Sequence, residues 1–182
     1  YYQNYDDYYS EIFSLNKSKI QNVFELGIGT TDSTNHYNMN FLGKKYSPGA
    51  SLRVWRDYFI NANIFGADID KNVLFSEDRI TTCWVDQLNK ESIINMYKNF
   101  GMEKFDIIID DGCHRYEETI NFFENSINKL SDDGVYVIED IVPSQRKRFL
   151  NYFKITNYKV KIINFHRPSN YLSSNSLITI RK

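Results

Sequence analysis

Two segments reveal the fold of this chain: Phe105-Asp-Ile-Ile-Ile-Asp-Asp-Gly-Cys-His114 and Val135-Tyr-Val-Ile-Glu-Asp140. Each begins as a short apolar run rich in β-branched residues, which is typical of a parallel strand buried on both faces. Each then ends abruptly in carboxylates. Ligands of open α/β sheets bind in the crevice outside the carboxyl ends of the strands. If these two strands are neighbours, that crevice collects one group of polar side chains: Asp110, Asp111, Glu139, Asp140 and, beside them, His114.

Such a group of carboxylates predicts a bound cation. Carboxylates packed together repel one another and raise each other's pKa unless a cation lies among them. Oxygen ligands favour Mg²⁺ or Mn²⁺ over zinc, so we expect a hard divalent ion and an enzyme. The alternative interpretations are structural. Asp110 and Asp111 would be cap or turn residues of the next helix, Glu139 and Asp140 a solvated strand end, and His114 a cap for a backbone carbonyl.

The rest of the chain alternates between strand and helix patterns. Strands are expected at residues 23–26, 63–69, 79–85, 105–110, 135–139, 159–165 and 176–180, with a turn at 131–134 before the fifth. Helices are expected near the N-terminus (Tyr1, Tyr5, Tyr8 and Ile12 on one face), from Ala50, over 89–100, after residue 114 and over 145–153. This alternation predicts a doubly wound α/β fold with a mainly parallel seven-stranded sheet, whose last two strands can form an antiparallel hairpin.

Composition narrows the class of protein. We interpret residues 1–182 as one domain, with an N-terminal helical segment over 1–20 and a lid-like loop over 30–49. A net charge of −1 disfavours a nucleic-acid or anionic-membrane partner. Two cysteines without zinc or disulfide spacing, no apolar run of membrane-spanning length and no visible signal peptide favour a cytoplasmic protein. A small-molecule or glycan partner and a homo-oligomer are both compatible with this composition.

Glycines and acids after the first three strands suggest a nucleotide-like cofactor. Gly27 and Gly29 follow the first strand and allow a tight turn close to a ligand, although Asp32 replaces the third glycine of a dinucleotide motif, so a plain turn is an equal alternative. Asp68 ends the second strand, where a carboxylate can accept hydrogen bonds from ribose hydroxyls. After the third strand come Asp86, a possible acceptor for an adenine amino group, and Gln87.

Glu25 lies inside the first strand, a costly place for a carboxylate without a partner. An α-amino group of a cofactor would satisfy it, and Ser51 at the following helix start is placed to contact the same end of that cofactor. Trp55 is interpreted as core, and Asp70 as a cap of the next turn. Four further residues remain undecided, with the histidines favoured as surface or packing residues: His36, His166, Arg167 and Tyr171.

Five motifs together carry a family resemblance: Phe24-Glu-Leu-Gly-Ile-Gly29, Ser51-Leu-Arg-Val-Trp55, Phe65-Gly-Ala-Asp-Ile-Asp70, Asp110-Asp-Gly-Cys-His114 and Gly134-Val-Tyr-Val-Ile-Glu-Asp140. In this order they resemble class I S-adenosylmethionine-dependent methyltransferases, and most closely the metal-dependent sugar O-methyltransferases of macrolide biosynthesis. The resemblance covers roughly residues 23–142. It implies a set of site residues: Asp111, Glu139 and Asp140 for Mg²⁺, His114 as general base with Asp111 beside it, and Glu25, Gly27, Gly29, Ser51, Asp68, Asp86, Gln87 and Asp110 around the cofactor.

The resemblance implies Mg²⁺-dependent methylation of a hydroxyl on a sugar-like acceptor, from a natural product or a surface polysaccharide. Coordination to a divalent ion lowers the pKa of such a hydroxyl, and a histidine with a pKa near 6.5 is suited to remove its proton. Two departures stand out: Cys113 where the family usually has Ser, and the polar loop 30–49. The alternatives are a catechol-like or phosphate-type acceptor, and a non-catalytic cofactor-binding subunit.

Overall fold

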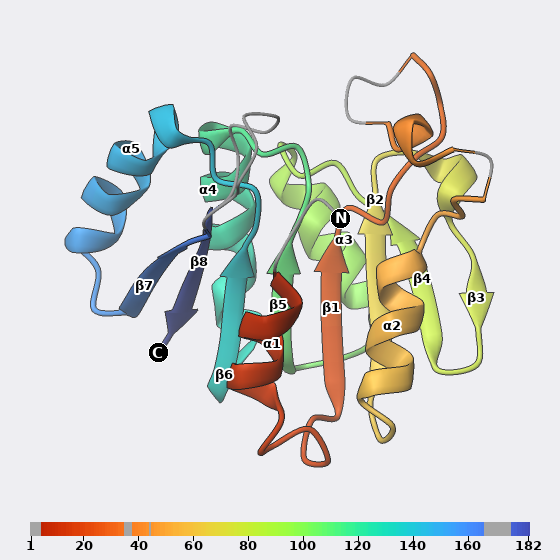
Figure 1. The fold of residues 1–182 in the computed structure, drawn as a ribbon, viewed down its shortest axis with the longest axis horizontal. Helices are drawn as coiled ribbons and strands as arrows, with labels where there is room; N and C mark the ends of the chain where they lie inside the picture. The colour runs from red at the N-terminus through yellow and green to blue at the C-terminus, as the bar shows by residue number, and fades with distance from the viewer. Residues whose placement is uncertain (1–4, 35–37, 44, 166–175) are drawn as a thin grey trace.

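The computed structural model describes residues 5–34, 38–43, 45–165 and 176–182. One mixed sheet of eight strands forms its centre, in the order β3-β4-β2-β1-β5-β6-β8-β7 (Figure 1). The strands are β1 (Asn22–Leu26), β2 (Asn63–Asp68), β3 (Ser76–Glu77), β4 (Ile80–Trp84), β5 (Phe105–Asp110), β6 (Leu130–Ile138), β7 (Lys159–Asn164) and β8 (Ser176–Arg181). The α-helices are α1 (Tyr5–Phe13), α2 (Ala50–Tyr58), α3 (Lys90–Phe100), α4 (Tyr116–Ser126) and α5 (Pro143–Lys154).

The five central strands β4, β2, β1, β5 and β6 run parallel, as their apolar sequences predict. β5 pairs directly with β6, with Ile109 opposite Val137 and Asp110 opposite Ile138. The expected adjacency of these two strands is therefore confirmed. β8 runs antiparallel between β6 and the edge strand β7, which confirms the antiparallel pairing of the last two strands.

The doubly wound α/β class is confirmed, but two details of the sheet differ from expectation. It has eight strands rather than seven, because the short β3 adds an antiparallel edge beside β4. β6 begins at Leu130, so the expected turn at 131–134 lies within the strand. Phe105 pairs with Leu130 and Ile107 pairs with Val135. Residues 131–134 therefore form an irregularity in the pairing of β5 with β6, and this pairing continues beyond them.

Helices cover both faces of the sheet (Figure 1). α1 and α2 pack on the front face over a core that includes Leu52, Ile64 and Ile109. α3, α4 and α5 pack on the opposite face against Phe24, Ile108 and the β6 residues of the same parity. Because successive side chains of a strand point to opposite faces, this division decides which strand-end side chains can meet.

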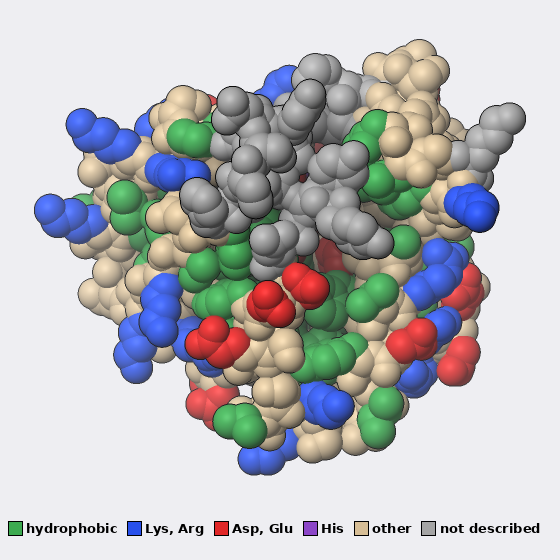
Figure 2. Space-filling view, viewed as in Figure 1, with side chains coloured by type: hydrophobic (Ala, Val, Ile, Leu, Met, Phe, Trp, Pro, Cys, Tyr) green, Lys and Arg blue, Asp and Glu red, His purple; other side chains and the backbone are tan. Residues whose placement is uncertain are grey.

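The N-terminal helix buries a different stripe from the one expected. Tyr5, Tyr9 and Phe13, spaced four residues apart, are buried, whereas Tyr8 and Ile12 are half-buried. The helix also exposes acidic residues in its first turn, and acidic side chains gather over α1 on the face shown in Figure 2. α1 is thus amphipathic, with aromatic rings on the sheet and carboxylates in solvent.

Other expectations concern exposed or undescribed parts of the chain. Among the described residues, no helix combines the length and apolar character needed to cross a bilayer. Cys83 and Cys113 are both free. Within the described parts of the loop 30–49 lies a short 3₁₀ helix (Asn40–Leu42), and the lid role of this loop stays a prediction. Several residues discussed above lie outside the described part of the chain: Tyr1, His36, His166, Arg167 and Tyr171.

Candidate functional site

The carboxyl ends of β1, β5 and β6 are joined by main-chain hydrogen bonds that extend beyond the strands. The Asp111 amide donates to the Leu26 carbonyl at 2.9 Å, and the Glu139 amide donates to the Asp110 carbonyl at 2.9 Å. These bonds fix the residues that follow β5 and β6 next to each other and next to the end of β1. The same edge therefore presents acidic side chains from three strands.

Asp111 and Glu139 are buried beside other carboxylates, whose negative charges repel theirs. Burial raises the pKa of Asp111 well above its ordinary value, and the charges of Glu139, Asp140 and Glu25 raise it further. Burial also raises the pKa of Glu139 to about 8, with further contributions from Glu25 and Asp140. Such a cluster favours a bound cation, because a positive charge among the carboxylates removes both the repulsion and part of the cost of burying them.

The three side chains best placed to share an ion are Asp111, His114 and Asp140. Each offers a ligand atom within 4.8 Å of the others, and His114 Nε2 lies 4.0 Å from Asp111 Oδ1. Glu139, also expected as a ligand, accepts a hydrogen bond from the Tyr9 hydroxyl, and its part in binding an ion stays a prediction. The oxygen-rich donor set fits Mg²⁺ or Mn²⁺, so the residues present agree with the expected ion.

Two of these residues have unusual backbone conformations. His114 has φ 55° and Asp140 has φ 52°, both in the left-handed region that non-glycine residues rarely adopt. Strain of this kind persists only where the surroundings hold the residue in place, and it gathers at functional sites. Burial lowers the pKa of His114, which favours the neutral imidazole that can accept a proton or ligate a metal.

Asp110 does not join this cluster. It lies on the strand face of Ile108, and its charge acts on the hydroxyls of Tyr136 and Tyr97 in the core beneath α3 and α4. It accepts a hydrogen bond from the Gly112 amide at 3.2 Å, and burial raises its pKa to about 7. The alternation of a strand sends the side chains of Asp110 and Asp111 to opposite faces, although the charge of Asp110 still raises the pKa of Asp111. The expected contact of Asp110 with a cofactor stays a prediction.

Glu25 has protein partners in its buried position. It accepts hydrogen bonds from the Ser51 hydroxyl and from the Trp55 indole, both on α2. Burial raises its pKa to about 7 even though both hydrogen bonds act in the opposite direction. Trp55 packs against the core of the front face, which confirms its interpretation as a core residue, and its indole additionally reaches Glu25.

Gly27 and Gly29 both have positive φ, at 85° and 81°. A Cβ on Gly27 would lie 2.1 Å from the Asp111 carbonyl oxygen, and one on Gly29 would lie 1.8 Å from the Tyr46 hydroxyl. Backbone conformation favours glycine at both positions, and at Gly27 the fixed main chain of Asp111 also leaves no space for a side chain. The loop after β1 is consequently pressed against the loop after β5.

Asp68 ties the end of β2 to the glycine loop. It accepts hydrogen bonds from the amides of Ile28 and Asp70, both at 2.9 Å, and burial raises its pKa. Asp70 accepts from the Asn72 amide at 2.9 Å as the cap of a 3₁₀ turn (Lys71–Val73), which confirms its expected role.

Asp86 and Gln87 follow β4 at the same edge. Asp86 accepts from the Leu88 amide at 3.0 Å, while Gln87 Oε1 accepts from the Cys113 amide at 3.0 Å. Gln87 therefore supports the loop that carries Asp111 and His114. A contact of either residue with a cofactor stays a prediction.

Sequence reasoning missed four aromatic residues near the site. Tyr46 comes from the loop 30–49, and its pKa is raised to about 12 by burial and by the charges of Glu25, Asp111 and Asp68. Tyr5, Tyr9 and Trp55 donate directly to the acidic cluster. The sequence places Tyr5 and Tyr8 on one helix face, whereas Tyr5 and Tyr9 are buried, and nothing local indicates which strand ends these tyrosines meet.

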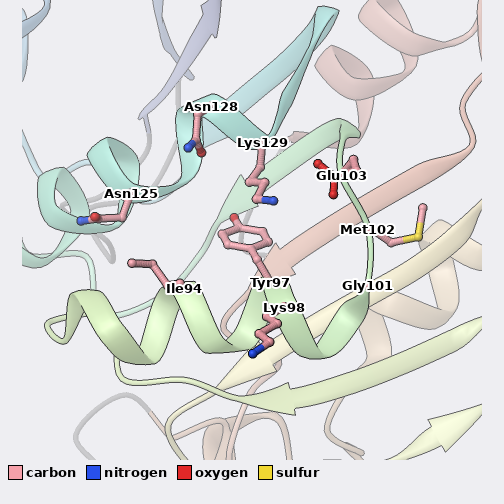
Figure 3. Close-up of a pocket in the computed structure, with 9 residues that line it drawn as sticks. All are labelled: Ile94, Tyr97, Lys98, Gly101, Met102, Glu103, Asn125, Asn128 and Lys129. Atoms are coloured by element: carbon pink, nitrogen blue, oxygen red, sulfur yellow. The ribbon is translucent and has the colours of Figure 1, made fainter.

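A separate cavity of about 380 Å³ lies away from these strand ends (Figure 3). It is lined by the C-terminal half of α3, the segment leading into β5 and the region where α4 ends, including Tyr97, Glu103 and Lys129. This position is at the amino end of β5. None of the predicted site residues lines it.

Comparison with known proteins places the chain in a family. Residues 49–141 match the family model described as a methyltransferase domain, and the chain belongs to this family. Over 93 residues it is 37% identical to demethylmacrocin O-methyltransferase of Streptomyces fradiae, covering 51% of this chain and 23% of that protein. It is 29% identical to 8-demethyl-8-alpha-L-rhamnosyl tetracenomycin-C 2'-O-methyltransferase of Streptomyces olivaceus over 136 residues, 75% of this chain and 32% of that protein.

A solved structure shares the fold. The MycE methyltransferase of the mycinamycin biosynthetic pathway, solved with Mg and SAH, superposes with a TM-score of 0.71 at 22% identity. The match covers 98% of this chain and 49% of that one. The chain thus spans about half of this structural neighbour and a third or less of the two curated relatives. The Rossmann-like fold expected for class I methyltransferases is confirmed.

Proposed function

We propose that this chain is a Mg²⁺-dependent O-methyltransferase that moves a methyl group from S-adenosylmethionine to a hydroxyl of a sugar-like acceptor. The observation that carries this proposal is the grouping of Asp111, His114 and Asp140 within 4.8 Å of one another. This group lies at the sheet edge that also presents the glycine loop and the buried Glu25. Because the candidate metal ligands lie beside the residues proposed to bind the cofactor, the site is suited to metal-assisted group transfer.

The cofactor would lie across the ends of β1, β2 and β4. Glu25, buried and with a pKa of about 7, would receive the α-amino group, and a positive charge there would favour its ionised form. Gly27 and Gly29 would let the backbone approach the ligand, while Asp68 would face the ribose. Ile69 and Leu88 are exposed apolar side chains that directly follow Asp68 and Gln87, and they would offer apolar surface to a planar base.

The reaction requires little covalent participation by the protein. When bound, Mg²⁺ acidifies an acceptor hydroxyl and S-adenosylmethionine supplies the methyl group. Asp111, Asp140 and Glu139 would hold the ion, and the neutral His114 would take the acceptor hydroxyl's proton on Nε2 as the new C–O bond forms. The electron pair of the donor's C–S bond would stay on sulfur. The remaining task of the site is to align donor and acceptor.

The acceptor class rests on the relatives. One relative described above is named for 2'-O-methylation of a rhamnosyl tetracenomycin compound, and the other for O-methylation of demethylmacrocin. Because the chain spans 32% and 23% of those two proteins, we propose only the acceptor chemistry, a sugar hydroxyl, for this chain. A catechol-like diol or a phosphate-type oxygen remains a second acceptor class. We further propose a cytoplasmic location and a small-molecule or glycan acceptor as its partner.

Titration calorimetry with S-adenosylhomocysteine tests the cofactor proposal. We expect saturable binding, and no heat at millimolar ligand would refute it. His114→Ala should abolish methyl transfer to a panel of sugar, catechol and phosphate acceptors while S-adenosylhomocysteine binding is retained. Mn²⁺ binding measured by electron paramagnetic resonance separates the two roles of His114: unchanged affinity supports a base, and a tenfold loss supports a metal ligand. Retained turnover would refute both roles.

A further inference from the structure

The N-terminal helix α1 directs two tyrosine hydroxyls at the two carboxylates that end β6. Tyr5 donates to Asp140 Oδ1 at 2.7 Å, and Tyr9 donates to Glu139 Oε1. Tyr5 and Tyr9 are four residues apart, so both lie on the face of α1 that packs on the sheet. Their two acceptors are consecutive in sequence.

The Tyr5 hydroxyl contacts both the side chain and the backbone of Asp140. The Tyr5 hydroxyl also lies 3.4 Å from the Asp140 amide, which donates to it. Asp140 has the left-handed φ of 52°, a conformation that its surroundings must maintain. A single hydroxyl that contacts both the amide and the carboxylate of one residue stabilises that conformation.

The rings that carry these hydroxyls are themselves fixed. Tyr9 is 7% exposed and packs edge-on against Trp55, with ring centroids 5.1 Å apart. It also stacks on Phe13 at 5.8 Å. Tyr5 is 5% exposed and contacts the Phe165 ring at 5.0 Å. The hydroxyls therefore act as rigid donors and not as mobile surface groups.

We propose that Tyr5 and Tyr9 are positioning residues that orient Asp140 and Glu139 for binding a divalent ion. This inference rests on the metal site of the proposed function. Ligand carboxylates in metal sites are themselves hydrogen-bonded by outer partners, and losing such a partner typically weakens metal binding 10- to 100-fold. Here α1, which precedes the sheet in sequence, supplies both partners. Docking of α1 is thereby coupled to metal affinity.

The same helix provides a matched control. The Tyr8 hydroxyl lies 3.3 Å from Thr179 Oγ1 on β8 and, among the residues that the structure describes, makes no hydrogen bond to a site carboxylate. Tyr8→Phe removes one hydroxyl from α1 exactly as Tyr5→Phe and Tyr9→Phe do, but away from the acidic cluster. Circular dichroism and thermal unfolding of all three variants establish that α1 and the sheet remain folded.

The test is Mn²⁺ affinity of the full chain, measured by electron paramagnetic resonance of the free ion without cofactor or acceptor. We expect Tyr5→Phe and Tyr9→Phe each to raise the Kd for Mn²⁺ about tenfold or more, and Tyr8→Phe to stay within about twofold of wild type. Tyr5→Phe alone carries the test if Tyr9→Phe does not fold. Wild-type affinity, or tighter binding, in the Tyr5 and Tyr9 variants overturns the inference while the metal site stands. Failure of the wild-type chain to bind Mn²⁺ overturns both.

Discussion

Replacing Glu25 by Gln is expected to stabilise the metal-free, cofactor-free protein at alkaline pH. Glu25 is buried, and its pKa is raised to about 7 in the folded chain. In the unfolded chain it has the ordinary value near 4.5. As pH rises from 4.5 to 7, the unfolded chain loses this proton before the folded chain does. The free energy of unfolding therefore falls with rising pH over this window and levels off above it.

The size of this effect follows from the two pKa values. The interval between about 4.5 and about 7 corresponds to about 3 kcal/mol of stability lost by pH 8. Gln has nearly the same shape and carries no charge at any pH. Glu25→Gln should therefore match the wild-type stability near pH 5 and exceed it by up to about 3 kcal/mol at pH 8.

Urea denaturation at several pH values, with a chelator present, measures this difference. Glu11→Gln, on the exposed side of α1, is the control and should leave the pH profile unchanged. The same Glu25→Gln variant should bind S-adenosylhomocysteine at least about tenfold more weakly, because a charge-assisted hydrogen bond to the ammonium is lost. Parallel pH profiles for the wild type and Glu25→Gln would refute the reasoning.

Two further substitutions test how the loops at the sheet edge are held. Gly27→Ala places a Cβ 2.1 Å from the Asp111 carbonyl oxygen at a φ of 85°, so we expect a loss of more than about 2 kcal/mol in urea denaturation; a loss below about 0.5 kcal/mol would contradict this. Gln87→Leu removes the acceptor of the Cys113 amide, so we expect a loss of about 1–2 kcal/mol of stability. Because Cys113 lies in the loop that carries Asp111 and His114, the affinity of the site for Mn²⁺ should change as well. Unchanged stability and affinity would show that Gln87 is dispensable there.

Much of the fold could be predicted because the signals were local. The apolar runs of β5 and β6, the acids after each strand and the alternation with helices all follow from side-chain periodicity over a few residues. The expected sheet of seven strands lacked β3, because a strand of two residues is too short to carry a periodic signal. The turn expected at 131–134 lies within β6, because β5 pairs with Leu130 before it and with Val135 after it.

The candidate site was only partly predictable, because local sequence signals identify its residues but not which of them meet. The sequence alone identified the acids at the strand ends, the two glycines with positive φ and the metal chemistry, because each depends on residue type and its place after a strand. Tertiary structure alone decided which of them meet. Strand alternation turned Asp110 toward Tyr136, and the packing of α1 directed Tyr9 at Glu139. Hydroxyls and carboxylates 130 residues apart come together only through long-range packing, which no local pattern in the chain encodes.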